Sequence, residues 1–186
     1  KQEVEAKILY ELEQEAEQVD PLTSGVLAVD WMNGRRTPYA NQSLKGAITG
    51  ISLGSNAPML YRSLIEATAY GAKAIVECFR ASGIEINEVI AIGGVAKKSP
   101  LNMQIVANVL DMPIKVAKSE QSVAVGAAIF AAVVGGVYET VEEAQANMAS
   151  KIEKVYMPEA EKVDLYQELY KKYLKVGKML EANQWN

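Results

Sequence analysis

The sequence contains no histidine and only one cysteine, Cys78, in its 186 residues. Without histidine the chain cannot build a Ser-His-Asp or Cys-His catalytic group, or a zinc site that depends on histidine. A single cysteine excludes an internal disulfide and is typical of a protein in a reducing compartment, so we expect a cytoplasmic protein.

The sequence also lacks a large net charge and a long apolar segment. The net charge is -4, and no basic run carries interleaved aromatic residues, so we expect no nucleic-acid partner. The longest apolar run, residues 122–137, is shorter than the roughly 20 residues that span a bilayer, and it is rich in alanine and glycine. This run predicts a helix buried against a sheet and neighbouring helices. We expect no membrane partner, and no signal-peptide pattern follows Lys1.

The residues that are present are ordinary for one globular domain, with 49% hydrophobic and 23% charged. Long helical patterns alternate with short strand patterns, which indicates an α/β domain with a ligand beyond the carboxyl ends of its strands. The predicted helices cover residues 1–19, 58–82, 100–110, 119–134, 140–149 and 159 onward, and the predicted strands cover residues 26–31, 89–92 and 114–117. The irregular segment 35–58 is typical of a binding loop.

One segment, residues 89–100, predicts a buried strand, a glycine turn and a helix that follows at once. Gly93 and Gly94 allow a tight turn where a Cβ would clash. Ser99 is a good N-cap and Pro100 suits the first helical position, so the first helical turn would offer free amides to an anion. This pattern fits a nucleotide cradle, and it fits equally an ordinary turn of an α/β protein.

A second strand and helix could complete such a cradle. The small residues Gly126, Ala127 and Ala128 would let the helix after strand 114–117 lie against the glycine turn. The common nucleotide motifs are absent, because no G-x-G-x-x-G occurs and Lys98-Ser99 lacks the glycine that a P-loop requires.

Two adjacent arginines follow a strong turn signal, Asn33-Gly34. The guanidinium groups of Arg35 and Arg36 could clamp a phosphate or a pair of sugar hydroxyls. The alternative interpretation is a hairpin tip with solvated arginines.

Residues 30–46, DWMNGRRTPYANQSLKG, resemble the signature region of the ribulokinase branch of the FGGY carbohydrate kinases. The resemblance continues through residues 64–79, the turn at 92–100 and the helix segment VGAAIF at 125–130. It covers roughly residues 26–173 and is highly specific. Where other family members carry a Gly-Glu-Arg loop or a variant of it, this chain has Asn33-Gly34-Arg35-Arg36.

The resemblance implies an actin/Hsp70-like, ribonuclease-H-like fold with a mixed sheet flanked by helices, of which this chain is the C-terminal lobe. It implies a linker helix with a truncated start at residues 1–25, the lobe at 26–157 and a packed C-terminal helix at 158–186. The family's adenosine motif falls on Gly93, Gly94, Val95 and Ala96, with Lys98 and Ser99 beside the nucleotide. The loop with Asn33, Arg35 and Arg36 is expected near the cleft between lobes.

The same resemblance implies ATP and Mg²⁺ as cofactors and L-ribulose as the sugar. The family's Asp-Xaa-Gly phosphate motif, second phosphate motif and aspartate general base are not found in this sequence, so we expect no catalytic residue and no metal ligand here. The general base is expected upstream of Lys1, and this chain alone is expected to be inactive.

Three interpretations stay open. The first is the nucleotide-binding lobe of a sugar kinase that makes L-ribulose 5-phosphate in arabinose catabolism. The second is a non-catalytic nucleotide-binding or self-association module of the same superfold, and a homo-oligomer fits this case because loss of a lobe would expose an apolar patch. The third is a purely structural domain that does not respond to ATP.

Overall fold

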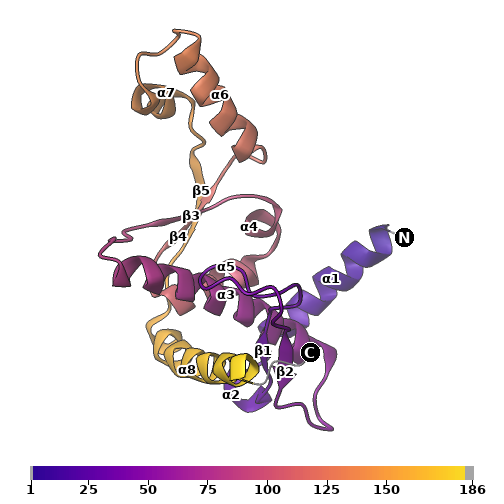
Figure 1. Cartoon of the computed structure of the whole chain (residues 1–186). Coiled ribbons are helices and arrows are strands. Elements are labelled where there is room, and N and C mark those ends of the chain that lie inside the picture. Colours follow the sequence, from indigo (N-terminus) through magenta and orange to yellow (C-terminus); the bar gives the residue numbers. More distant parts are fainter. Residues whose placement is uncertain (1, 183–186) are drawn as a thin grey trace.

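The computed structural model describes residues 2–182 as a helical body, a small sheet above it and a helical arm beyond the sheet (Figure 1). The body contains α1 (Gln2–Glu17), α2 (Pro21–Ser24), α3 (Ala57–Ala81), α5 (Pro100–Leu110), α8 (Ala160–Ala182) and the antiparallel pair β1 (Leu27–Val29) and β2 (Ala47–Thr49). The sheet contains β3 (Val89–Ala91), β4 (Ile114–Ala117) and β5 (Ile152–Tyr156), and α4 (Gly94–Lys98) follows β3. The arm is formed by α6 (Ser122–Val134) and α7 (Val141–Met148).

The main core lies where α3 crosses α1, α5 and α8. Helix α3 begins after Asn56, whose side chain accepts a hydrogen bond from the Met59 amide, and ends before Gly83, which has φ +79°. This agrees with the predicted helix 58–82 and its glycine stop. Val29, Tyr70 and Tyr166 are almost fully buried in this core. Burial of one such side chain stabilises a fold by about 1.5–3 kcal/mol.

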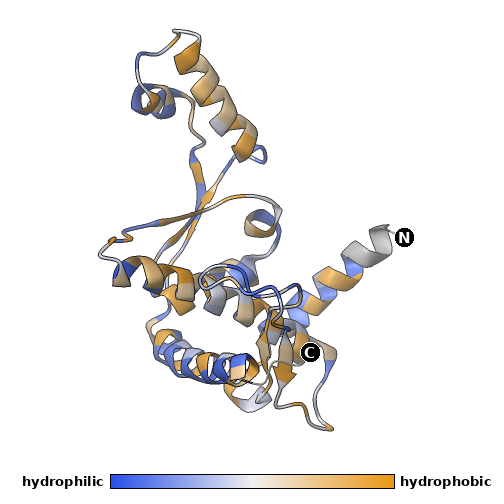
Figure 2. Cartoon of the chain, in the orientation of Figure 1, coloured by the Kyte–Doolittle hydropathy of each residue, from blue (hydrophilic) through white to orange (hydrophobic). Residues whose placement is uncertain are grey.

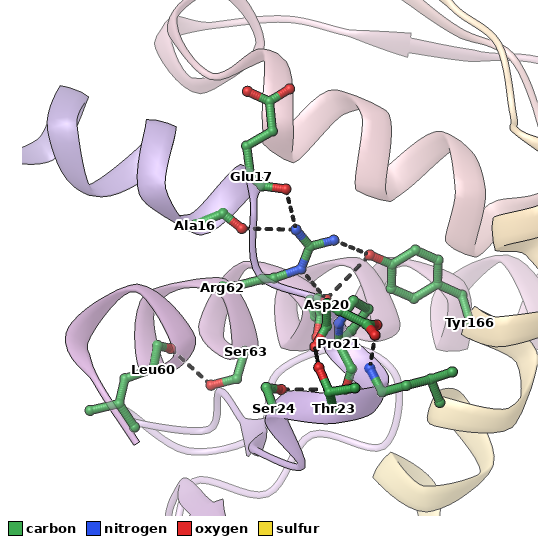
Figure 3. A network of polar contacts seen from close by, with 12 residues as sticks. Ala16, Glu17, Asp20, Pro21, Thr23, Ser24, Leu60, Arg62, Ser63 and Tyr166 are labelled. Carbon is green, nitrogen blue, oxygen red and sulfur yellow. Dashed lines mark hydrogen bonds and ion pairs between the residues drawn. The ribbon is translucent and has the colours of Figure 1, made fainter. Parts of the chain in front are cut away.

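A buried polar network ties three helices of the body together (Figure 3). Arg62 of α3 donates from Nε to Glu66 Oε1 at 2.8 Å and from Nη2 to the Tyr166 hydroxyl of α8 at 2.9 Å. Its Nη1 donates to the main-chain oxygen of Ala16 at 2.9 Å, at the end of α1. Burial raises the pKa of Glu66, and the Arg62 charge opposes that rise. Each partner of the buried guanidinium therefore comes from α1, α3 or α8.

The sheet is mixed, as expected. Strands β3 and β4 are parallel, β4 and β5 are antiparallel, and β4 lies between the other two. Helix α5 covers one face, where Ile114 and Val116 are buried.

The prediction that the strand before the glycine turn is buried is wrong. Ile90 keeps 52% of its surface exposed and Ile92 keeps 53%. The continuous apolar run fits burial on both faces, yet in the described part of the chain the elements packed on the sheet lie on the α5 side.

The prediction that helix 119–134 is buried is also wrong. Helix α6 packs on α7, and of its residues only Ile129 is buried, while Val123 is 81% and Val134 90% exposed. Figure 2 shows it as a largely apolar helix on the arm. A helix that is apolar on all sides is buried only when neighbours pack on every side of it, and α7 covers only one side of α6. Ser119 is not its N-cap: that position is Gln121, and the Ser119 hydroxyl accepts from the Gln121 amide at 3.1 Å.

Four short elements differ from the prediction. The helix α2 forms between the predicted helix 1–19 and the predicted strand 26–31. β2 forms inside the segment predicted to be irregular, α4 separates the glycine turn from α5, and β5 was not predicted. The predicted strand 26–31 is shortened to β1. The predicted division at residues 25 and 157 stays a prediction. Between residues 2 and 182, every helix is too short or too polar to traverse a bilayer.

Candidate functional site

A cavity of about 720 Å³ opens where the β3 turn, α4 and the start of α5 meet β4 and β5. Its size lies within the range of about 300–1,000 Å³ that is usual for ligand pockets. The cavity is at the carboxyl ends of the parallel strands β3 and β4, where an α/β sheet is expected to bind its ligand. Its lining residues are Gly93, Gly94, Ala96, Lys97, Lys98, Pro100, Val116, Glu120, Gln121, Glu153, Lys154 and Tyr156.

The two glycines of the turn serve different needs. Gly93 has φ +87°, a conformation that favours glycine whatever its surroundings. Gly94 does not have a positive φ. A Cβ added to either residue would meet no atom within 4 Å, so the expected clash with neighbouring protein atoms is not found. The room beside Gly94 is open space at the wall of the cavity and is available to a ligand.

The anion site predicted at the start of the helix that follows the glycine turn, α5, is already occupied by a side chain of the protein. Ser99 is the N-cap of α5 and accepts from the Asn102 amide, as expected. Its hydroxyl also donates to Glu13 Oε1 at 2.7 Å, and the Leu101 amide donates to the same oxygen at 3.3 Å. A carboxylate of the protein itself therefore occupies the positive end of α5. Ser99 is buried and is not among the residues that line the cavity.

The cavity has three lysines and two glutamates in its lining. Lys97 is engaged, because its Nζ donates to the Lys118 oxygen at 2.5 Å and lies 3.2 Å from Glu153 Oε2. Lys154 Nζ lies over the ring of Tyr156, 4.3 Å from its centroid. Lys98 is exposed at the end of α4. Lys98 and Lys154 are the cations best placed to meet an anionic group.

Four of the six residues predicted to bind the nucleotide line the cavity: Gly93, Gly94, Ala96 and Lys98. Val95, which is 60% exposed, and Ser99 do not. The sequence interpretation missed Lys154 and Tyr156 because it missed β5. The local signal is weak, because Ile152–Tyr156 reads Ile-Glu-Lys-Val-Tyr and lacks the regular alternation of apolar and polar residues that is typical of a strand. The antiparallel register then pairs Lys154 with Val116 of β4.

A second cavity of about 390 Å³ lies between the 30–39 loop, α3 and α8, and shares no lining residue with the first. Arg35 and Arg36 line it, whereas Asn33 does not and is exposed. Arg35 is held by the protein: it forms an ion pair with Glu181 and its Nε donates to the Tyr39 oxygen at 2.7 Å. Burial raises the pKa of Asp30, which lines the same cavity.

Neither cavity has the ligands of a complete metal site. Among residues 2–182, no three or more aspartate, glutamate, cysteine or histidine side chains are grouped so that they could hold a metal ion. Glu120 and Glu153 are the carboxylates on the first cavity.

Comparison with known proteins shows which family shares this arrangement. The model of the C-terminal domain of the FGGY family of carbohydrate kinases matches residues 1–135. The chain belongs to the FGGY family. This match contains the glycine turn, the cavity lysines Lys97 and Lys98, and the arginine loop.

Among relatives of this FGGY chain is a ribulokinase of Vibrio parahaemolyticus, 48% identical over 182 residues, which are 97% of this chain and 32% of the relative. A ribulokinase of Bacillus licheniformis is 43% identical over 176 residues, 92% of this chain and 32% of the relative. The chain thus spans about a third of the length of these curated relatives.

Solved structures confirm the FGGY fold. A xylulose kinase from Rhodospirillum rubrum has a TM-score of 0.78 at 25% identity, and the match covers 93% of this chain and 34% of the xylulose kinase chain. A xyloylose kinase from Brucella ovis has a TM-score of 0.82 at 21% identity, over 97% of this chain and 37% of the Brucella chain. The expected fold class, a C-terminal sugar-kinase lobe with a mixed sheet and helices, is confirmed.

Proposed function

We propose that this chain is the nucleotide-binding lobe of an ATP-dependent sugar kinase that converts L-ribulose to L-ribulose 5-phosphate. The observation that carries the proposal is the cavity at the Gly93-Gly94 turn. The turn, α4 and the β4 side of the cavity lie in the part of the chain that matches the FGGY model, and β5 adds Glu153, Lys154 and Tyr156 from beyond residue 135. The names of the ribulokinase relatives support L-ribulose as the sugar.

The residues of the cavity fit a nucleotide. The bare backbone at Gly94, with Ala96 beside it, offers a flat wall for adenosine. Lys98 and Lys154 would face the phosphates. Phosphoryl transfer depends on positioning and on neutralising charge, and Mg²⁺ that bridges the phosphates supplies part of that neutralisation. The described residues do not fit a complete Mg²⁺ site, so we assign the ion to the nucleotide phosphates rather than to this lobe.

We further propose that the chain alone does not phosphorylate sugar. The sequence has no Asp-Xaa-Gly phosphate motif, and the chain spans about a third of the length of its kinase relatives. Both substrates would meet only in a longer protein, where Arg36 of the second cavity is available to the sugar side of the cleft. Arg35 is held by Glu181 and Tyr39.

Thermal unfolding in the presence of MgATP tests the nucleotide site. Saturation to one hundred times Kd stabilises a fold by about 2.7 kcal/mol. We expect such a shift for the wild-type chain and none for Gly94→Val, because the branched side chain takes the room beside the cavity wall. Gly126→Val is the matched control, since Gly126 also has open space around it but lies on α6 away from the cavity lining. No shift in the wild type, or an equal shift in Gly94→Val, would contradict the proposal.

The sugar is tested in the full-length protein by a coupled kinase assay with L-ribulose and D-xylulose. Faster turnover of L-ribulose is expected. Equal rates with both sugars would contradict the ribulokinase assignment and leave the nucleotide site unaffected.

A second function, self-association, is favoured by one observation. The apolar surface of α6 is exposed at Val123, Phe130 and Val134, and lies beside further exposed apolar residues of the arm such as Val137. Sedimentation velocity tests for self-association. A dimer that persists at micromolar concentration and dissociates in Phe130→Asp supports a self-association module. A monomer at all concentrations argues against it.

A further inference from the structure

Glu13 joins the N-terminal helix to the start of α5. It lies on α1, half-buried, and its Oε1 accepts from the Ser99 hydroxyl at 2.7 Å and from the Leu101 amide at 3.3 Å. A carboxylate is favoured at this place because the first amides of a helix carry partial positive charge. Glu13 is the residue that occupies the anion position of α5, and it contributes nothing to the lining of the cavity.

Ser99 transmits this contact to the cavity wall. It is the single residue between α4 and α5. Its amide donates to the Val95 oxygen at 3.0 Å and closes α4, while its own oxygen accepts from the Met103 amide at 3.3 Å and opens α5. The backbone of Ser99 therefore joins the last turn of α4, which carries Ala96 and Lys98 to the cavity, to the first turn of α5, and its hydroxyl ties this junction to Glu13.

Helix α1 is itself anchored one turn beyond Glu13. Arg62 Nη1 donates to the main-chain oxygens of Ala16 at 2.9 Å and Glu17 at 3.4 Å. Glu66 and Tyr166 hold the same guanidinium, and Figure 3 shows the contact with Tyr166. Residues 13, 16 and 17 lie on one side of α1 because three or four residues make a helical turn. The buried network therefore holds the helix that presents Glu13.

We propose that Glu13 is a positioning residue for the nucleotide cavity: its carboxylate fixes the α4–α5 junction and excludes the nucleotide phosphates from the end of α5. That the excluded ligand is a nucleotide rests on the proposed function, whereas the role of Glu13 in fixing α4 does not. The phosphates are then left to Lys98 and Lys154, which line the cavity.

Nucleotide affinity and chemical rescue test the role of Glu13. In Glu13→Ala we expect the Kd for MgATP to rise about tenfold, since a charge-assisted hydrogen bond is lost. Acetate should restore the affinity of Glu13→Ala, because its carboxylate fits the vacated space, and potassium chloride at equal ionic strength should not. Glu13→Gln leaves no such space and should not respond to acetate. Glu15→Ala, an exposed change on the same helix, should bind like the wild type.

A purely structural role predicts another pattern: lower stability with unchanged affinity of the folded protein and no response to acetate, and this result would overturn the proposal. Hydrogen–deuterium exchange of residues 94–99 gives a readout that needs no nucleotide. Faster exchange in Glu13→Ala than in Glu15→Ala supports the fixing of α4 even if the wild-type chain fails to bind MgATP. Equal exchange in the two variants would overturn it.

Discussion

The guanidinium of Arg35 lies over the indole ring of Trp31, 5.0 Å from its centroid. Arg35 also pairs with Glu181 near the end of α8, so the loop that follows β1 and the last helix meet at this side chain. The neighbouring Arg36 is exposed on the wall of the same cavity. The two adjacent arginines, which look alike in the sequence, therefore have different surroundings.

Substitution of these two arginines should separate stability from binding. Arg35→Ala should lower the free energy of unfolding by about 1 kcal/mol, because a cation–π contact and a partly exposed ion pair are lost. Arg36→Ala should leave stability unchanged and, in the full-length kinase, raise the KM for the sugar. Denaturant unfolding and steady-state kinetics measure the two effects. Loss of stability in Arg36→Ala would contradict this assignment.

Two buried tyrosines should respond in opposite ways to loss of the hydroxyl. In the part of the chain that the structure describes, the Tyr70 hydroxyl is the buried side-chain polar atom without a hydrogen-bond partner. The Tyr166 hydroxyl accepts from Arg62 at 2.9 Å and lies 3.2 Å from Glu66 Oε1. Tyr70→Phe should raise the free energy of unfolding by about 1 kcal/mol, whereas Tyr166→Phe should lower it by about 2 kcal/mol. Chemical denaturation of both variants checks the signs, and destabilisation by Tyr70→Phe would show that its hydroxyl has a partner.

Alkaline pH should unfold the protein through its tyrosine cluster. Burial raises the pKa of Tyr173 to about 12 and raises the pKa values of Tyr70, Tyr166 and Tyr170 as well. Because the folded pKa values exceed those of the unfolded chain, this stability is fully present below about pH 10 and is lost as the pH rises through the folded values. Thermal melts from pH 8 to 12 should show a constant melting temperature and then a steep fall. In Tyr70→Phe the melting temperature should fall less steeply with pH. An unchanged slope would show that ionisation of Tyr70 does not contribute to the alkaline unfolding.

The two lysines at the end of α4 should differ in the same way as the arginines. Lys98→Ala should weaken the binding of ATP more than that of adenosine, at unchanged stability, because only the phosphates carry charge. Lys97→Ala should lower stability, since its Nζ joins α4 to Lys118 and Glu153. Calorimetric titration with both ligands, together with thermal melts, measures these effects. Equal losses for ATP and adenosine in Lys98→Ala would place Lys98 away from the phosphates.

The elements predicted best are those whose signals are local. Strand β4 matches its predicted residues 114–117, and α3 differs from its prediction by one residue at each end, because Asn56 and Gly83 fix those ends through nearby backbone groups. The glycine turn is local for the same reason. β5 was missed because its residues Ile-Glu-Lys-Val-Tyr do not alternate between apolar and polar, and this short strand is fixed by its pairing with β4.

The sequence by itself determined the family, the mixed α/β character and the glycine turn, because these depend on residue identity and on contacts within a few positions. Only the tertiary structure decided that Glu13 fills the end of α5, that Lys154 joins the cavity and that α6 is exposed. Each of these depends on residues distant in the chain: Glu13 and Ser99 are brought together by the packing of α1, and Val116 and Lys154 by strand register. Hydropathy gives the tendency of a segment to be buried, but the presence of a packing partner decides whether it is.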